Sequence, residues 1–109
     1  MGTAKQGITL EPVYWVYILY CENNTYYTGY TTDLQKRYQS HVDGTGKCKY
    51  TRSFRPRHIA QCWQVVGDKA LAMQLERYIK TLSRAEKEHI ISCPTALSND
   101  SRVQPKYDT

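Results

Sequence analysis

The sequence predicts a single α/β domain of the α+β class, in which a small three-stranded antiparallel sheet is flanked by helices. Two apolar and aromatic runs, residues 14–20 and 26–30, are separated by Asn23-Asn24 and therefore pair most simply as an antiparallel hairpin. A third run, residues 58–66, is enriched in aromatic and β-branched side chains, and residues 69–82 carry apolar side chains at helical spacing. The chain has 109 residues, which is enough for one modest core but not for two.

The first strand, residues 14–20, is expected to be covered by protein on both faces. Its Trp15, Tyr17 and Leu19 alternate with two aliphatic residues, so nearly every side chain is apolar or aromatic. The Tyr17 ring is then packed in protein, and its hydroxyl needs a hydrogen-bond partner or an open cleft. Tyr27 lies on the opposite arm of the hairpin.

The helix after the hairpin is expected to begin at about Asp33. Thr32 and Gln35 have the spacing of a capping box at a helix N-terminus. Helical geometry then places Arg37 and His41 one turn apart, on the same side of the helix. Two phenols, a guanidinium and an imidazole can therefore meet over one face of the sheet.

The segment between Gly44 and Gly67 carries the whole excess of positive charge. It contains five basic residues and no acidic one, whereas the rest of the chain has ten of each, so the net charge of +5 lies in this segment. With aromatic residues interleaved, it suits phosphate neutralisation and base stacking, and we expect a loop or a short helix here. The candidate DNA-binding residues are Lys47, Lys49, Tyr50, Arg52, Arg55 and Arg57.

The helix predicted for residues 69–82 has a buried stripe that includes Leu75 and Ile79. Glu76 falls on the border of that stripe, where a carboxylate can point along the sheet. Ser83 and Glu86 repeat the capping-box spacing and predict the start of a second, shorter helix.

The domain predicted from these elements spans residues 13–92, between a flexible N-terminal arm, residues 1–12, and a disordered C-terminal tail, residues 93–109. The four cysteines contain no close pair of the kind that zinc sites use, so we expect reduced thiols, no zinc and a cytoplasmic protein. The longest apolar run, residues 13–21, is about half of the ~20 residues needed to cross a bilayer, which argues against insertion in a membrane.

The order of several residues carries a resemblance to a known family. Val16-Tyr17 is followed by Tyr27-Thr28-Gly29, then by Arg37, His41 and, in the later helix, Glu76. This ordered set resembles the GIY-YIG nuclease domain, and the chain looks most like the small stand-alone GIY-YIG proteins of bacteria. It departs from the family pattern in its opening tripeptide, which is Trp-Val-Tyr, and in lacking an asparagine that many members carry after the glutamate.

The resemblance implies a metal-dependent endonuclease that hydrolyses DNA phosphodiester bonds, selects for DNA structure and serves repair or recombination. Its catalytic set would be Tyr17, Tyr27, Arg37, His41 and Glu76, with Tyr17 narrowly preferred to Tyr27 as the general base. Glu76 would hold Mg²⁺, for which Mn²⁺ is an alternative, with waters and the substrate phosphate as the other ligands. Gly29 would let the strand end approach the phosphate closely.

Each of these residues alone has a plainer interpretation. Most tyrosines in such strands belong to the core or its rim, and a helical glutamate is more often solvated and paired with Arg77 or Lys80. The alternative function is a non-catalytic nucleic-acid-binding module with a relic site, and an RNA-binding α/β domain is a third. The sequence identifies neither a partner protein nor a preferred DNA among duplex, branched and single-stranded forms.

Overall fold

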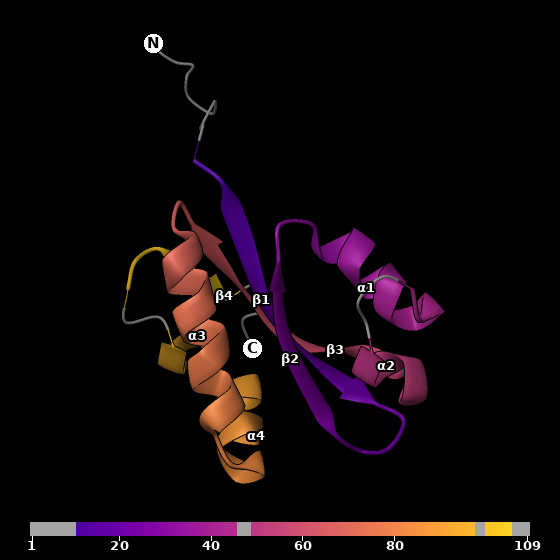
Figure 1. The fold of residues 1–109 in the computed structure, drawn as a ribbon. Coiled ribbons are helices and arrows are strands. Elements are labelled where there is room, and N and C mark those ends of the chain that lie inside the picture. The colour runs from indigo at the N-terminus through magenta and orange to yellow at the C-terminus, as the bar shows by residue number, and fades with distance from the viewer. Residues whose placement is uncertain (1–10, 46–48, 98–99, 106–109) are drawn as a thin grey trace.

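The computed structural model describes residues 11–45, 49–97 and 100–105 of the chain. The predicted N-terminal arm therefore lies mostly outside the described residues. The elements run, in chain order, as β1 (Val13–Cys21), β2 (Tyr26–Thr31), α1 (Leu34–Asp43), α2 (Lys49–Ser53), β3 (Pro56–Val66), α3 (Lys69–Thr81), α4 (Arg84–Ser92), the 3-10 helix η2 (Pro94–Leu97) and β4 (Val103–Pro105) (Figure 1).

The sheet is antiparallel and has four described strands in the order β2-β1-β3-β4, so the prediction of three strands was wrong by one. The additional strand, β4, pairs Val103 with Val65 and Pro105 with Trp63. It lies in the segment expected to be a disordered tail, and its Val103 is only 2% exposed. The Trp63 indole also donates a hydrogen bond to the Pro94 carbonyl at 2.9 Å. The described part of that segment is therefore packed against β3.

The predicted hairpin is confirmed, with β1 in the middle of the sheet between β2 and β3. The register places Tyr17 opposite Gly29 and Leu19 opposite Tyr27. Because side chains alternate along a strand, these four residues share one face of the sheet. Val16 and Ile18 point to the other face, and all the β1 side chains from Val16 to Leu19 are at most 1% exposed. The strand is covered on both faces, as its composition predicts.

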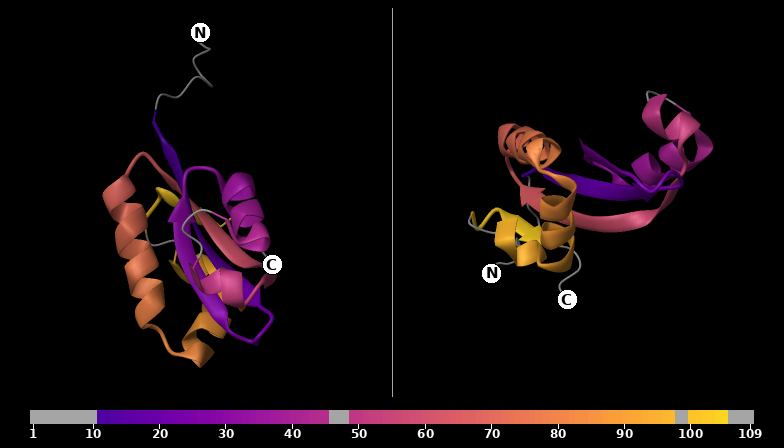
Figure 2. Two further views of the ribbon diagram at one scale, coloured as in Figure 1. Left: turned by 45° about the vertical axis from the view of Figure 1, so that its right-hand side comes forward. Right: turned by 90° about the horizontal axis from the view of Figure 1, so that it is seen from below.

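Helices cover the two faces separately, as Figures 1 and 2 show from three directions. On one face, α3, α4 and η2 pack against a core that includes Val16, Ile18 and Trp63. On the other face, Leu34 and Tyr38 of α1 pack against a smaller core around Tyr17. The strand β2 forms one edge of the sheet, and α3 contacts both β1 and β2.

The ends of the helices follow from local capping. The N-cap of α1 is Asp33 rather than Thr32, because the Asp33 carboxylate accepts a hydrogen bond from the Lys36 amide at 3.1 Å. Gly44 ends the helix in the left-handed conformation, with φ of 71°. The capping box predicted before α4 is present, with Ser83 and Glu86 each bonded to the backbone of the other.

Three of the four cysteines lie in the described residues, and all three are free thiols. Cys21 and Cys62 are buried, and Cys93 is exposed. Burial raises the pKa of the Cys21 thiol. No helix in the described ranges is both long and apolar enough to span a bilayer.

Candidate active site

A chain of buried polar side chains links the sheet to α1 and α2. The Tyr17 hydroxyl lies 2.9 Å from Nε2 of His41, and Nδ1 of the same ring lies 2.7 Å from Oγ1 of Thr51. Tyr17 is 1% exposed, and His41 and Thr51 are fully buried. The phenol of β1, the imidazole of α1 and the hydroxyl of α2 are therefore held in one hydrogen-bonded line.

The His41 imidazole is neutral at neutral pH. Burial, with a smaller contribution from the positive charge of Arg37, lowers the pKa of His41 to about 4. A neutral imidazole has one N–H and one lone pair, so one ring nitrogen donates and the other accepts. The ring can therefore accept from one of the two hydroxyls, Tyr17 or Thr51, while it donates to the other.

The packing around position 29 explains why a glycine occurs there. A Cβ at this position would lie 2.5 Å from the Tyr17 hydroxyl oxygen and 2.8 Å from the carbon that bears it, which is too close for either atom. The Tyr17 phenol occupies the space that a side chain at position 29 would fill. In this position its hydroxyl reaches His41. The expected approach of the Gly29 backbone to a phosphate stays a prediction.

Tyr27 is the more accessible of the two tyrosines. It is half-buried, and its ring centroid lies 5.1 Å from that of His41 in an edge contact. On its other side Tyr27 stacks against Tyr50, with centroids 5.7 Å apart and planes 20° from parallel. Phe54 continues the row at 5.3 Å from Tyr50, and both outer rings are more than one-third exposed. A row of aromatic faces thus leads from His41 to the surface.

The turn between β1 and β2, residues 22–25, fixes the Tyr50 ring. The Asn23 amide donates a hydrogen bond to the Tyr50 hydroxyl at 3.2 Å, and Thr25 is hydrogen-bonded to the same hydroxyl. Together with the Thr51 bond to His41, these contacts anchor α2 beside the site. These roles could not be predicted from local sequence patterns, since the partners lie 10 to 27 residues apart in the chain.

Arg37 lies in a cavity of about 480 Å³ at the junction of β2, α1 and α3. Lys69, the first residue of α3, lines the same cavity, as do the hydroxyl side chains of Thr31 and Thr32. Two cations and two hydroxyls around one cavity are suited to binding phosphate oxygens. Lys69 was not among the sequence candidates, because no spacing along the chain relates it to Arg37.

Glu76 lies on α3, beside the buried Ala72 and Ile79. Within the described residues its ion-pair partner is Lys80, whose Nζ lies 3.1 Å from the carboxylate. The Glu76 side chain is 18% exposed and that of Lys80 is 51% exposed. This is the pairing expected of a structural glutamate, so a metal-binding role for Glu76 stays a prediction.

The described residues offer Mg²⁺ single carboxylates rather than a cluster of ligands. No cluster of three or more His, Cys, Asp and Glu side chains suited to a metal occurs in the described part of the chain. A single partly exposed carboxylate, such as Glu76, fits a Mg²⁺ ion that keeps several waters and takes its remaining ligands from substrate phosphate.

The basic segment is only partly accounted for by the described residues. Lys47 lies outside them, and Lys49 begins α2. Arg52 and Arg57 are exposed. Arg55 is also exposed, but its guanidinium donates a hydrogen bond to the Val42 carbonyl at the end of α1. Arg55 therefore has a structural role in addition to any contact with DNA.

Comparison with known proteins identifies the family. A family model described as the GIY-YIG catalytic domain matches residues 13–89, which is well over half of the chain. The chain belongs to the GIY-YIG family. The GIY-YIG match includes every candidate catalytic residue from Tyr17 to Glu76 and ends before η2 and β4.

Two curated relatives illustrate how similar the GIY-YIG region is. The UPF0213 protein BH0048 of Halalkalibacterium halodurans is 42% identical over 79 residues, covering 72% of this chain and 82% of the relative. The UPF0213 protein VNG_2274C of Halobacterium salinarum is 47% identical over 73 residues, covering 67% of this chain and 92% of the relative. A solution NMR structure of BH0048 matches at 38% identity with a TM-score of 0.47, covering 81% of this chain and 99% of that one.

Proposed function

We propose that this protein is an endonuclease that hydrolyses DNA phosphodiester bonds with the help of a divalent metal ion. The observation that carries the proposal is the position of Tyr27, a half-buried phenol that packs on the neutral His41 ring and opens to the surface along Tyr50. A general base has to come within hydrogen-bond reach of the attacking water, which requires a side chain that solvent can reach.

In this proposal Tyr27 is the general base and Tyr17 is a positioning residue. Tyr17 is 1% exposed and its hydroxyl is bonded to His41, so an attacking water has little access to it. Its hydrogen bond fixes the imidazole against the Tyr27 ring. Burial thus favours the opposite order from the one that the sequence resemblance suggested.

Phosphate binding falls to the cations beside the edge strand. Arg37 and Lys69 line one cavity and would neutralise the charge that develops on the phosphate oxygens in the transition state. Glu76 is the side chain proposed to hold Mg²⁺ or Mn²⁺, which would supply further charge neutralisation at the phosphate.

The test is cleavage of a set of flaps, forks, single strands and duplexes in Mg²⁺, in Mn²⁺ and with EDTA. We expect cleavage only with metal, and its loss in Glu76→Gln, which keeps the shape of the side chain and removes its charge. Glu86→Gln is the matched control, because Glu86 caps α4 away from the proposed site. Full Mg²⁺-dependent activity in Glu76→Gln would show that another group holds the metal.

A non-catalytic nucleic-acid-binding module is the second candidate. It is favoured by the Glu76–Lys80 ion pair, which leaves the carboxylate in the arrangement of an ordinary surface residue. Under this alternative the same substrates bind in a salt-dependent way, but none is cut under any metal condition.

For the endonuclease, the proposed biological setting is DNA repair or recombination in the cytoplasm. Its selectivity would be supplied by DNA shape or by a partner protein.

A further inference from the structure

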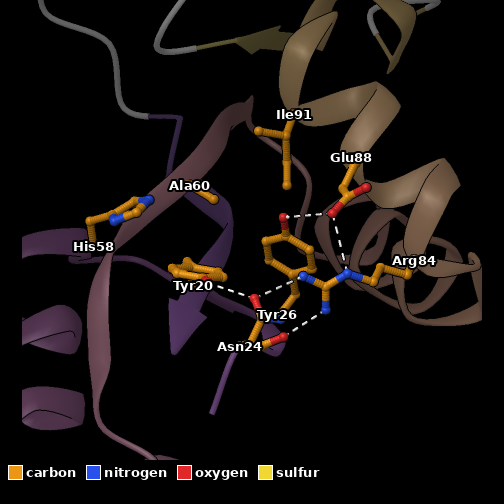
Figure 3. A pocket seen from close by; sticks show the side chains of 8 residues that line it. All are labelled: Tyr20, Asn24, Tyr26, His58, Ala60, Arg84, Glu88 and Ile91. Atoms are coloured by element: carbon orange, nitrogen blue, oxygen red, sulfur yellow. Dashed lines mark hydrogen bonds and ion pairs between the residues drawn. The ribbon is translucent and has the colours of Figure 1, made fainter. Parts of the chain in front are cut away.

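A second cavity, of about 400 Å³, lies beside the β1–β2 turn on the side of the sheet that faces α4 (Figure 3). Its volume is within the range of about 300–1,000 Å³ that is typical of ligand sites. None of the candidate catalytic residues lines it. Its lining includes three aromatic rings, those of Tyr20, Tyr26 and His58, and three polar side chains, those of Asn24, Arg84 and Glu88.

The three rings form a continuous aromatic wall. The Tyr20 ring centroid lies 5.7 Å from that of Tyr26 and 5.4 Å from that of His58. Figure 3 shows His58 and Tyr20 on one side of the cavity, and Arg84 with Glu88 on the other. Such a wall offers flat faces on which a nucleobase can stack, because every base has a π-face.

The polar side of the cavity is held in a fixed arrangement. The Arg84 guanidinium donates to the Asn24 carbonyl at 2.6 Å, to the Asn24 side chain at 3.1 Å and to Glu88 at 3.2 Å. It also lies over the Tyr26 ring, 4.8 Å from the centroid. Three of the five N–H donors of Arg84 are thus engaged within the protein. The Glu88 carboxylate in the same cavity offers an acceptor to a ligand.

One oxygen of that carboxylate is available. The Tyr26 hydroxyl donates to Oε2 of Glu88 at 3.3 Å, and the Arg84 contact also falls on Oε2. Among the described residues, Oε1 accepts no hydrogen bond. A ligand that stacks on the aromatic wall and offers N–H donors along its edge would satisfy both parts of the cavity.

We infer that this cavity binds one unpaired nucleobase of the DNA substrate and that it prefers guanine. Guanine presents two adjacent N–H donors, on N1 and on the exocyclic N2, and both can be directed at the one available oxygen, Oε1 of Glu88. Cytosine and adenine present an exocyclic amine beside a ring acceptor, which pairs less well with a carboxylate. The inference rests on the proposed function, since the base arrives as part of the strand that is cut.

The cavity and the proposed catalytic tyrosine lie back to back on the edge strand. Tyr26 and Tyr27 are consecutive in β2, so their side chains point to opposite faces of the sheet. The turn that joins β1 to β2 contacts both sites, since Asn23 bonds to Tyr50 and Asn24 to Tyr20 and Arg84. A DNA strand that passes round this turn can place a phosphate near Tyr27 and a neighbouring base in the cavity. The substrate class is therefore DNA with an extrahelical or single-stranded nucleotide beside the cut.

The test measures binding by fluorescence anisotropy in EDTA, where no cleavage occurs. The probes are duplexes of one sequence that carry a single extrahelical G, A, C, T or abasic nucleotide, together with the fully paired duplex. We expect wild-type protein to bind the extrahelical G about tenfold more tightly than the abasic site, in line with the contribution of one stacked base. This comparison needs no variant.

Variants then assign the preference to the cavity. We expect Tyr20→Ala to bring all the extrahelical bases to the affinity of the abasic site, and Glu88→Gln to remove the preference for G while stacking persists. Tyr78→Ala is the matched control, because Tyr78 is an exposed tyrosine on α3 outside this cavity. Binding of the fully paired duplex should be the same for all these proteins.

Equal affinity of the wild-type protein for the extrahelical G and the abasic site would overturn the inference. So would a preference for G that survives in both Tyr20→Ala and Glu88→Gln. Neither result bears on metal-dependent cleavage, which is measured separately. Conversely, a preference for G in a protein that cuts no DNA would support the base site and contradict the endonuclease.

Discussion

His41 connects the candidate site through both of its ring nitrogens. One faces the Tyr17 hydroxyl and the other the Thr51 hydroxyl, and the ring is fully buried. Protonation would place a charge in a buried site without water to solvate it and, to a smaller extent, near the Arg37 cation, so the pKa of His41 falls to about 4. The folded protein therefore favours the neutral form of the His41 imidazole.

Acidification should therefore destabilise the protein through His41. The unfolded chain takes up a proton near pH 6.5, whereas the folded chain resists it down to about pH 4. The contribution of neutral His41 to the free energy of unfolding is fully present above pH 6.5. It is lost as the pH falls towards 4, by up to about 3 kcal/mol. Urea unfolding at a series of pH values would measure it. In His41→Gln this part of the pH dependence should disappear, whereas the exposed-site control His89→Gln should keep it.

Gly29→Ala should be destabilising because of Tyr17. The added Cβ would meet the phenol at 2.5 Å, and we expect a loss of about 1–3 kcal/mol in the free energy of unfolding. The same substitution in a Tyr17→Phe background removes the nearest atom and should cost less. An equal cost in both backgrounds would mean that the glycine is required for a reason other than the position of the phenol.

At the scale of elements, the short helix α2 is attached to the site by one side chain at its centre. Thr51 is buried, whereas Tyr50, Arg52 and Ser53 of the same helix are exposed. A helix this short has little stability of its own, so its position depends on such tertiary contacts. The Tyr27–Tyr50 stack depends on that position in turn.

Thr51→Val should therefore loosen α2 as well as lower stability. Valine keeps the shape but leaves a ring nitrogen of His41 without its partner, at a cost of about 1–3 kcal/mol. Faster hydrogen exchange of the α2 amides, with β1 unchanged, would be the local sign of this effect. Ser53→Ala in the same helix is the control, since Ser53 is exposed. Unchanged exchange in Thr51→Val would mean that other contacts hold α2.

The arginines that follow α2 should separate into two kinds. Arg57→Ala removes an exposed cation, so it should weaken binding of all DNA substrates alike and reduce the salt slope by about one. Arg55→Ala also breaks the bond to the end of α1, so it should lower thermal stability as well. Binding at several salt concentrations, with melting curves for both variants, would test this. If Arg55→Ala were as stable as Arg57→Ala, the bond to α1 would contribute nothing.

At the scale of the whole molecule, features set by local pattern could be predicted from the sequence. The hairpin, β3 and the two long helices follow from alternation, helical spacing and capping residues. The strand β4 has three residues, which is too short for any period to be visible, and it exists because β3 offers it a free edge. The sequence therefore did not predict this strand.

The candidate residues of the site could be named from the sequence, but their arrangement in space could not. The spacing of Tyr17, Tyr27, Arg37, His41 and Glu76 identified them as candidates without showing which hydroxyl is buried. Burial of Tyr17 depends on α1 and on the missing Cβ of Gly29, and these meet only in the folded chain. The partners Thr51 and Lys69 come from segments brought together by tertiary packing, so no local motif indicates them.

In the proposed mechanism Tyr27, held against neutral His41, activates the water that cuts DNA. The decisive experiment is the single-turnover rate of cleavage of a branched DNA in Mg²⁺ by Tyr27→Phe, beside wild-type protein and Tyr17→Phe. We expect a loss of at least about a hundredfold in Tyr27→Phe with DNA binding retained, as for removal of a general base, and a smaller loss in Tyr17→Phe. Cleavage by Tyr27→Phe at the wild-type rate would contradict it.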